Sequence, residues 1–199
     1  MRRAAIRQSE LCAVDLLCRQ GFASIFDLGR PQIDRFRLPV TVQFDSYAGF
    51  CKSTGASRAS LFPHSGADGL SVRHNGIYLV LYDERVESER RRAFTLAHEI
   101  GHILLGHAGG EDAAIEEREA NAFAASLLAP AAAVRYLAHR EGCEVSEELL
   151  TSFFFLSREA AQNRARELAH RAKRPPAAAE ITLLLQLFGR LDGGQKGTP

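Results

Sequence analysis

The residues best suited to chemistry form a His-Glu-x-x-His pattern, made by His98, Glu99 and His102. On an α-helix, residues four positions apart lie on one face, so both imidazoles can bind the same metal ion. Glu99 lies one position further round the helix, where its carboxylate could take a proton from an attacking water. The pattern therefore favours a hydrolytic metal site. The alternative is a chance match of two core histidines and a capped glutamate.

The residues around this pattern are typical of a buried helix. Ser88 and Glu89 are suited to its start, and Gly106 is suited to its end. Gly101 has no side chain and leaves room for another element to pack closely. The apolar residues of this helix are Ala93, Phe94, Leu96, Ala97, Ile100, Ile103, Leu104 and Leu105.

A third metal ligand is expected from a second helix, predicted over Glu111–Ala129. Catalytic zinc usually takes three protein ligands and keeps one open position. Glu117 and Asn121 lie one turn apart, so Glu117 could bind the metal while Asn121 hydrogen-bonds the second nitrogen of a histidine ligand. Glu119 is the competing carboxylate, but it points about 200° away from Glu117, which suits a surface or arginine-paired role. Taken alone, the acidic cluster would suit a solvated helix start.

Two segments in this order resemble the ImmA/IrrE-type zinc metallo-endopeptidase family. The first covers residues 92–107 and contains the His-Glu-x-x-His pattern, and the second covers residues 117–130. A looser resemblance extends from residue 75 to residue 170. The family often has a methionine before the proline of the second segment, where this chain has Ala129. That difference changes packing and leaves the chemistry intact.

The resemblance implies a function and a set of site residues. Members are bacterial, phage and mobile-element proteins that use zinc to cleave a partner transcriptional repressor. Carried over to this chain, His98, His102 and Glu117 are the zinc ligands and Glu99 is the general base. Because Glu119 also matches the family pattern, the choice between the two carboxylates stays open. The implied partner is a repressor with a helix-turn-helix.

Length and composition are those of a single domain. The chain has 199 residues, is 46% hydrophobic and carries a net charge of +1. A near-neutral charge gives no field that would attract nucleic acid or a membrane, and no apolar run is long enough to span a bilayer. We expect one zincin-like domain over residues 1–175, followed by a partly disordered tail over residues 176–199.

Cysteine usage points to the cytoplasm. No apolar stretch follows the first three residues, so no signal peptide is expected, and the cysteines lack the Cys-x-x-Cys spacing of a zinc ribbon. We therefore expect the free thiols of a cytoplasmic protein. These cysteines are Cys12, Cys18, Cys51 and Cys143.

The predicted fold class is α+β, mostly helical, with a small antiparallel sheet before the histidine helix and a C-terminal helical hairpin. The clearest strand signal is Asn75-Gly76 between two apolar runs, which predicts a β-hairpin over residues 70–82. The other predicted elements are a helix over 9–21, a short element over 24–28, a strand over 38–44, a loop over 51–69, a helix over 130–141 and a closing helix or strand over 181–188.

The helical pair predicted over residues 146–170 has the spacing of a helix-turn-helix. Its second helix carries Arg158, Arg164 and Arg166, which suggests a rival function: a zinc-containing regulator that acts by binding DNA or protein rather than by proteolysis. Glu159 and Glu167 dilute this basic face, so we expect the pair to pack on the catalytic core, without DNA binding.

The remaining histidines show no ligand spacing. His107 lies five residues after His102, off the ligand face, and is expected to support a ligand or cap the helix. His107 and Tyr136 are also candidates for stabilising an oxyanion. The other histidines, expected at the surface, are His64, His74, His139 and His170.

Overall fold

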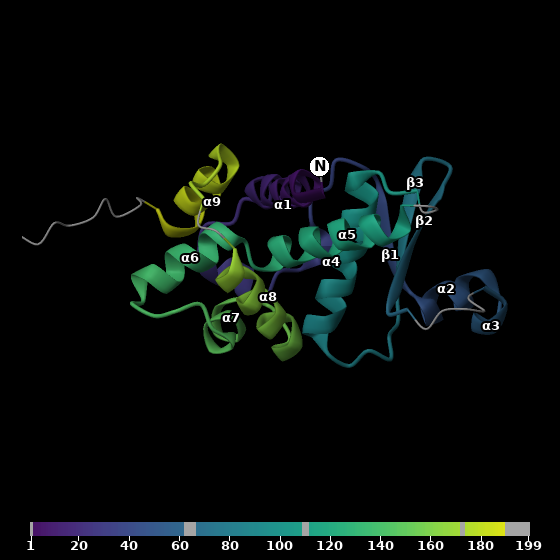
Figure 1. Cartoon of the computed structure of the whole chain (residues 1–199). Coiled ribbons are helices and arrows are strands. Elements are labelled where there is room, and N and C mark those ends of the chain that lie inside the picture. Colours follow the sequence, from purple (N-terminus) through teal and green to yellow (C-terminus); the bar gives the residue numbers. More distant parts are fainter. Residues whose placement is uncertain (1, 62–66, 109–111, 172–173, 190–199) are drawn as a thin grey trace, which may run out of the picture.

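A computed structural model describes residues 2–61, 67–108, 112–171 and 174–189 of the chain. Helices dominate it, and a small sheet lies along one side of the central helices (Figure 1). This confirms a mostly helical α+β fold. The helices are α1 (Arg2–Cys18), α2 (Tyr47–Thr54), α3 (Arg58–Leu61), α4 (Glu89–Leu105), α5 (Ala113–Leu128), α6 (Ala131–Arg140), α7 (Glu147–Phe153), α8 (Arg158–His170) and α9 (Ala178–Phe188), with short 3-10 helices at Ile25–Gly29 and Ile33–Arg35.

The sheet contains the predicted hairpin. Strands β2 (Gly69–His74) and β3 (Ile77–Tyr82) pair in antiparallel fashion, joined by Asn75 and Gly76. Both turn residues have positive φ angles, 49° and 80°, as the tight hairpin turn favoured by Asn-Gly requires. The local sequence therefore predicted this part of the sheet correctly.

The third strand corrects the expected antiparallel sheet. Strand β1 (Val42–Ser46) pairs with β3 in parallel, so the sheet is mixed and has the order β1-β3-β2. A parallel pair needs a long connection between its strands. Here the connection contains α2, α3 and β2, and β2 reverses the chain before β3 begins. The strand also lies later than the predicted span 38–44.

The predicted loop over residues 51–69 is wrong where α2 and α3 form. The Ser46 hydroxyl accepts a hydrogen bond from the Gly49 amide at 2.9 Å and caps α2, which ends at Gly55 with a left-handed φ of 70°. Small residues favour turns, but here the capped start and the glycine stop define a short helix that packs through the buried Tyr47. Helix α1 similarly begins at residue 2, well before the predicted start at residue 9.

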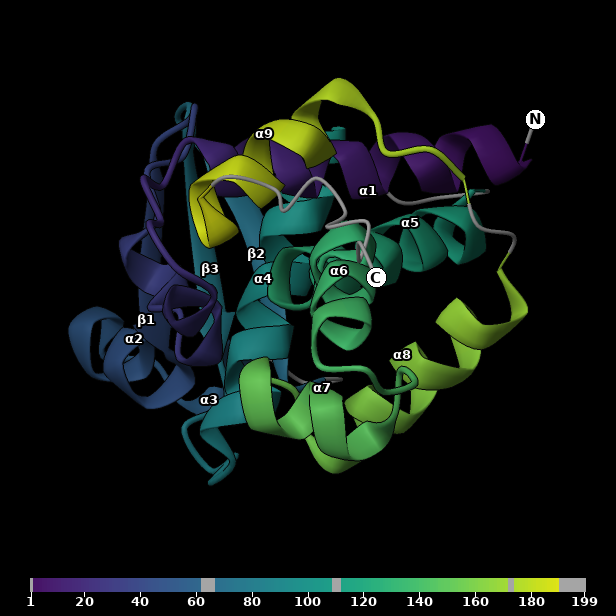
Figure 2. The same cartoon turned by 90° about the vertical axis from the view of Figure 1, so that its left-hand side faces the viewer.

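The core depends on the close crossing of α4 and α5. Gly101 faces α5, and a Cβ atom at this position would lie 3.1 Å from the Phe123 ring and 3.3 Å from the Ala120 Cα. The absent side chain therefore lets the two backbones approach, as the sequence predicted. Helix α1 packs on α5, and α9 packs on α1 (Figure 2).

The chain beyond residue 175 contributes to this core. The apolar run at 181–188 lies in a helix, α9, which buries Leu183, Leu184 and Leu187. An ion pair between Arg7 and Glu180 ties α9 to α1. Of the tail predicted to be partly disordered, residues 190–199 fall outside the described residues. In the described part of the chain, no helix combines the length and the apolar character needed to cross a bilayer.

The α7–α8 pair packs on the core rather than presenting a basic face. Arg164 is 2% exposed and donates hydrogen bonds to the Ala129 carbonyl at 2.9 Å and the Ser126 hydroxyl at 3.2 Å. Arg158 pairs with Glu147. Arg164 is therefore enclosed between α8 and the end of α5 and is not available to a nucleic acid.

We predict that Arg164→Ala lowers the free energy of unfolding by about 3 kcal/mol, because it leaves the buried Ala129 carbonyl without a partner. The exposed Arg166, two residues later on α8, is the matched control, and Arg166→Ala should cost less than about 0.5 kcal/mol. Urea unfolding followed by circular dichroism measures both. Equal losses would show that Arg164 does not anchor α8.

Candidate metal centre

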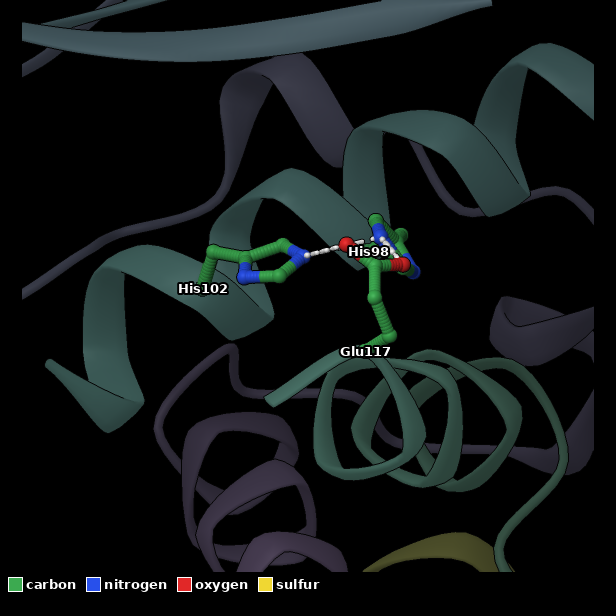
Figure 3. Close-up of side chains that lie close together, drawn as sticks. All are labelled: His98, His102 and Glu117. Atoms are coloured by element: carbon green, nitrogen blue, oxygen red, sulfur yellow. Dashed lines mark hydrogen bonds and ion pairs between the residues drawn. The ribbon is translucent and has the colours of Figure 1, made fainter. Parts of the chain in front are cut away.

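The two histidines of the motif converge with a carboxylate from the next helix. His98 and His102 lie on one face of α4, and Glu117 reaches them from α5 (Figure 3). The Nε2 atoms of the histidines lie 2.9 Å apart. The Glu117 oxygens lie 3.4 Å from the His98 Nε2 and 3.3 Å from the His102 Nε2. The predicted ligand set is therefore brought together in space.

The donor atoms fit a zinc ion. Zinc–nitrogen distances of about 2.0–2.1 Å in tetrahedral geometry place neighbouring donor atoms about 3.3 Å apart. The three separations given above lie close to this value. Two imidazoles and one carboxylate also form the donor set of many catalytic zinc sites. His98, His102 and Glu117 could thus hold a zinc ion and leave its fourth position open.

The α4 helix is built to present this face. The Ser88 hydroxyl caps its start by accepting a hydrogen bond from the Arg91 amide at 3.3 Å, and Gly106 ends it with a left-handed φ of 73°. Both ends agree with the sequence prediction. Burial lowers the pKa of His102, followed by the effect of the neighbouring His98, and so favours the neutral imidazole that a metal requires.

Asn121 supports His98 as predicted. The Nδ1 atom of His98 lies 3.1 Å from the Asn121 side-chain oxygen. With Nε2 directed at the metal, Nδ1 carries the hydrogen and donates it to that oxygen. Glu117 and Asn121, one turn apart on α5, therefore lie beside the two ring nitrogens of His98: Glu117 beside Nε2 and Asn121 beside Nδ1.

A second chain of contacts supports His102. Its Nδ1 lies 3.0 Å from the Nδ1 of His107, and the Nε2 of His107 lies 3.1 Å from the Glu119 carboxylate. With Nε2 of His102 facing the metal, its Nδ1–H donates to His107, and the Nε2–H of His107 donates to Glu119. The His107 and Glu119 side chains are only 6% and 17% exposed.

The surface or arginine-paired role expected for Glu119 is therefore wrong. His107 comes after the end of α4, where the chain turns back and the His107 amide donates to the His102 carbonyl at 3.0 Å. Positions on a helix cannot predict where a residue beyond the helix end will point. The expectation that His107 supports a ligand agrees with these contacts.

Glu99 lies between α4 and strand β2. Glu99 is 8% exposed, and this burial raises the pKa of its carboxyl group. A hydrogen bond with Ser71 has the opposite, smaller effect on the pKa. Gly69 makes this approach possible, because a Cβ atom there would lie 2.5 Å from the Thr95 methyl group. Sequence reasoning missed Ser71 and Gly69, since neither belongs to a recognisable motif.

The other candidate residues lie elsewhere. Tyr136 packs against Phe188 in the contact between α6 and α9, with ring centroids 4.5 Å apart. His74, His139 and His170 are exposed, as expected, and His64 falls outside the described residues.

Two histidines and a glutamate around one point, with a buried glutamate beside them, define a site of the metallohydrolase type. The chain belongs to the family of the IrrE N-terminal-like domain, a metallopeptidase family whose model matches residues 57–166. The match covers more than half of the chain and confirms the resemblance seen in the two motif segments. No curated protein was found to match the chain. Family membership makes this protein a metallopeptidase.

We predict about one zinc ion per chain, since one set of three ligands holds one ion. His98→Ala and His102→Ala should each abolish binding, measured by elemental analysis of the purified protein. Retention of zinc by both variants would place the metal elsewhere.

We also predict different losses of zinc affinity for the two candidate carboxylates. Glu119→Gln should weaken zinc binding about tenfold, the lower end of what loss of an outer hydrogen-bond partner costs. Glu117→Gln removes a ligand and should weaken it considerably more. Competition with a chromophoric chelator measures both affinities, with the exposed Glu141→Gln as control. The opposite ranking would make Glu119 the ligand.

Proposed function

We propose that this protein is a zinc-dependent endopeptidase that hydrolyses a peptide bond in a partner protein. The observation that carries the proposal is the convergence of His98, His102 and Glu117 beside the buried carboxylate of Glu99. A site that only stabilised the fold would need no such base, because structural zinc has no reacting water.

The side chains have distinct tasks in this reaction. A zinc ion held here would supply Lewis-acid activation of the water and of the scissile carbonyl group. Glu99 accepts the proton of the attacking water and passes it to the leaving amine. Burial raises the pKa of its carboxyl group and so suits it to both halves of this transfer. Asn121 and His107 keep the two imidazoles oriented.

Strand β2 is suited to hold an extended substrate. It is an edge strand, paired on one side with β3 and packed beside α4 (Figure 2). The free edge of such a strand can pair with a polypeptide through main-chain hydrogen bonds. The contact between Gly69 and α4 brings this edge close to Glu99.

The substrate we propose is a transcriptional repressor with a helix-turn-helix, from a phage, a mobile element or a stress regulon. The resemblance to the ImmA/IrrE family supports this choice. The rival function, a zinc-containing regulator that binds DNA or protein, depends on the α7–α8 pair. Buried Arg164 and paired Arg158 weaken that rival, because phosphate contacts need free cations.

We predict that Glu99→Gln keeps zinc and the fold but slows cleavage of the repressor by about 10²–10⁴-fold, the usual contribution of a general base. A repressor-controlled reporter in cells should then stay repressed. Zinc content and thermal unfolding serve as controls for the intact site.

The rival function makes the opposite prediction. Charge reversal at the exposed Arg158 and Arg166 should leave relief of repression mostly intact if proteolysis is responsible. Full activity of Glu99→Gln, together with tight and salt-sensitive DNA binding, would establish the regulator instead.

A further inference from the structure

A cleft of about 740 Å³ opens beside the metal centre. Thr95 and Asn121 line it, and these residues adjoin His98: Thr95 precedes it by one turn of α4, and Asn121 is bonded to its ring. The cleft continues between α5 and α8, whose positions Figure 2 shows. Its volume lies within the range of about 300–1,000 Å³ typical of ligand sites and exceeds the size of any single side chain.

The walls of the cleft are largely apolar. Phe94 from α4, Ala122 and Ala125 from α5 and Ala160 from α8 line it and are each partly exposed. The alanines are too short to fill the space between the helices, so the cleft has room for a large side chain from a ligand. Burial of an apolar group against this surface would favour binding.

Most charged groups on the rim already have partners. Asp68 is paired with Arg91, and Arg164 is paired with Glu167. Arg118 differs from these arginines: it is exposed, lines the cleft and has no hydrogen-bond or ion-pair partner among the described residues. It directly follows Glu117 on α5. Glu159, on the α8 wall, is likewise exposed and unpaired among the described residues. The cleft therefore presents an unpaired positive charge close to the metal ligands and an unpaired negative charge on α8.

We propose that this cleft binds the part of the substrate that adjoins the scissile bond, and that it selects a large apolar side chain with a carboxylate side chain next to it. The apolar side chain lies against Ala122 and Ala125, and the carboxylate pairs with Arg118. The proposal rests on the proposed function, because it assumes that the adjoining metal centre is where the peptide bond is cleaved. It adds the class of peptide that the site accepts.

Fluorescent dipeptide hydroxamates test this selectivity without requiring cleavage, because the hydroxamate group chelates zinc while the side chains sample the cleft. Two series, with the hydroxamate before or after the dipeptide, cover both sides of the scissile bond. Each series contains leucine–glutamate, leucine–lysine and glycine–glutamate members. Fluorescence anisotropy on the zinc-loaded full-length chain gives the affinities.

In one of the two series, the leucine–glutamate probe should bind about tenfold more tightly than the glycine–glutamate probe, the lower limit for burying a leucine side chain. It should also bind more tightly than the leucine–lysine probe. Arg118→Glu should reverse the order of the glutamate and lysine probes. Ala122→Leu and, independently, Ala125→Leu should remove the leucine preference by filling the cleft. The exposed Arg19→Glu, at the end of α1, is the matched charge control and should change neither preference.

Equal affinities of the three probes within both series would overturn the proposal. Probe preferences that remain unchanged in Arg118→Glu and in the two alanine variants would also overturn it, provided that these variants show normal thermal unfolding. Cleavage of peptides with the same side chains separates this result from the proposed function. Selective hydroxamate binding without cleavage of any peptide would retain the cleft as a binding site and refute the endopeptidase. Cleavage without selectivity would retain the endopeptidase and refute the proposal.

Discussion

The close crossing of α4 and α5 is the contact on which the site depends. Gly101 allows it, because any side chain there would meet Phe123 and the backbone of Ala120. The crossing sets the distance between the histidines on α4 and Glu117 on α5. Donor atoms must lie within a few tenths of an ångström of their positions to bind zinc well. A packing constraint in the core therefore becomes a constraint on metal binding.

The residues that surround the candidate metal ligands come from different segments of the chain. They lie around the crossing of α4 and α5. Asn121 and Glu119 both lie on α5, and each reaches a different histidine, directly or through His107. Strand β2 approaches α4 from another side and encloses Glu99. Helix α5 thus carries Glu117 together with the residues that contact the histidines, whereas β2 contacts Glu99.

Local signals in the sequence were sufficient for much of the site. The spacing of His98 and His102 placed both on one helical face, and Ser88 and Gly106 marked the ends of that helix correctly. The same reasoning placed Glu117 and Asn121 one turn apart and facing the histidines. Family membership followed from residues within these two helices. The geometry of a single helix determines which of its residues share a face, whereas the packing of α4 on α5 brings the two faces together.

The tertiary structure decided what covers each helical face. It turned His107 back toward His102 and placed Glu119 against it, made β1 parallel to β3, and buried Arg164 of α8 against the end of α5. Residues far apart in the chain make these contacts, and periodicity shows only which side of an element is apolar or polar. The cleft beside the metal centre is of the same kind, because its walls come from α4, α5 and α8. The sequence by itself determined the candidate site residues and the helices that carry them, whereas packing between distant elements determined the residues that contact them and the cleft beside them.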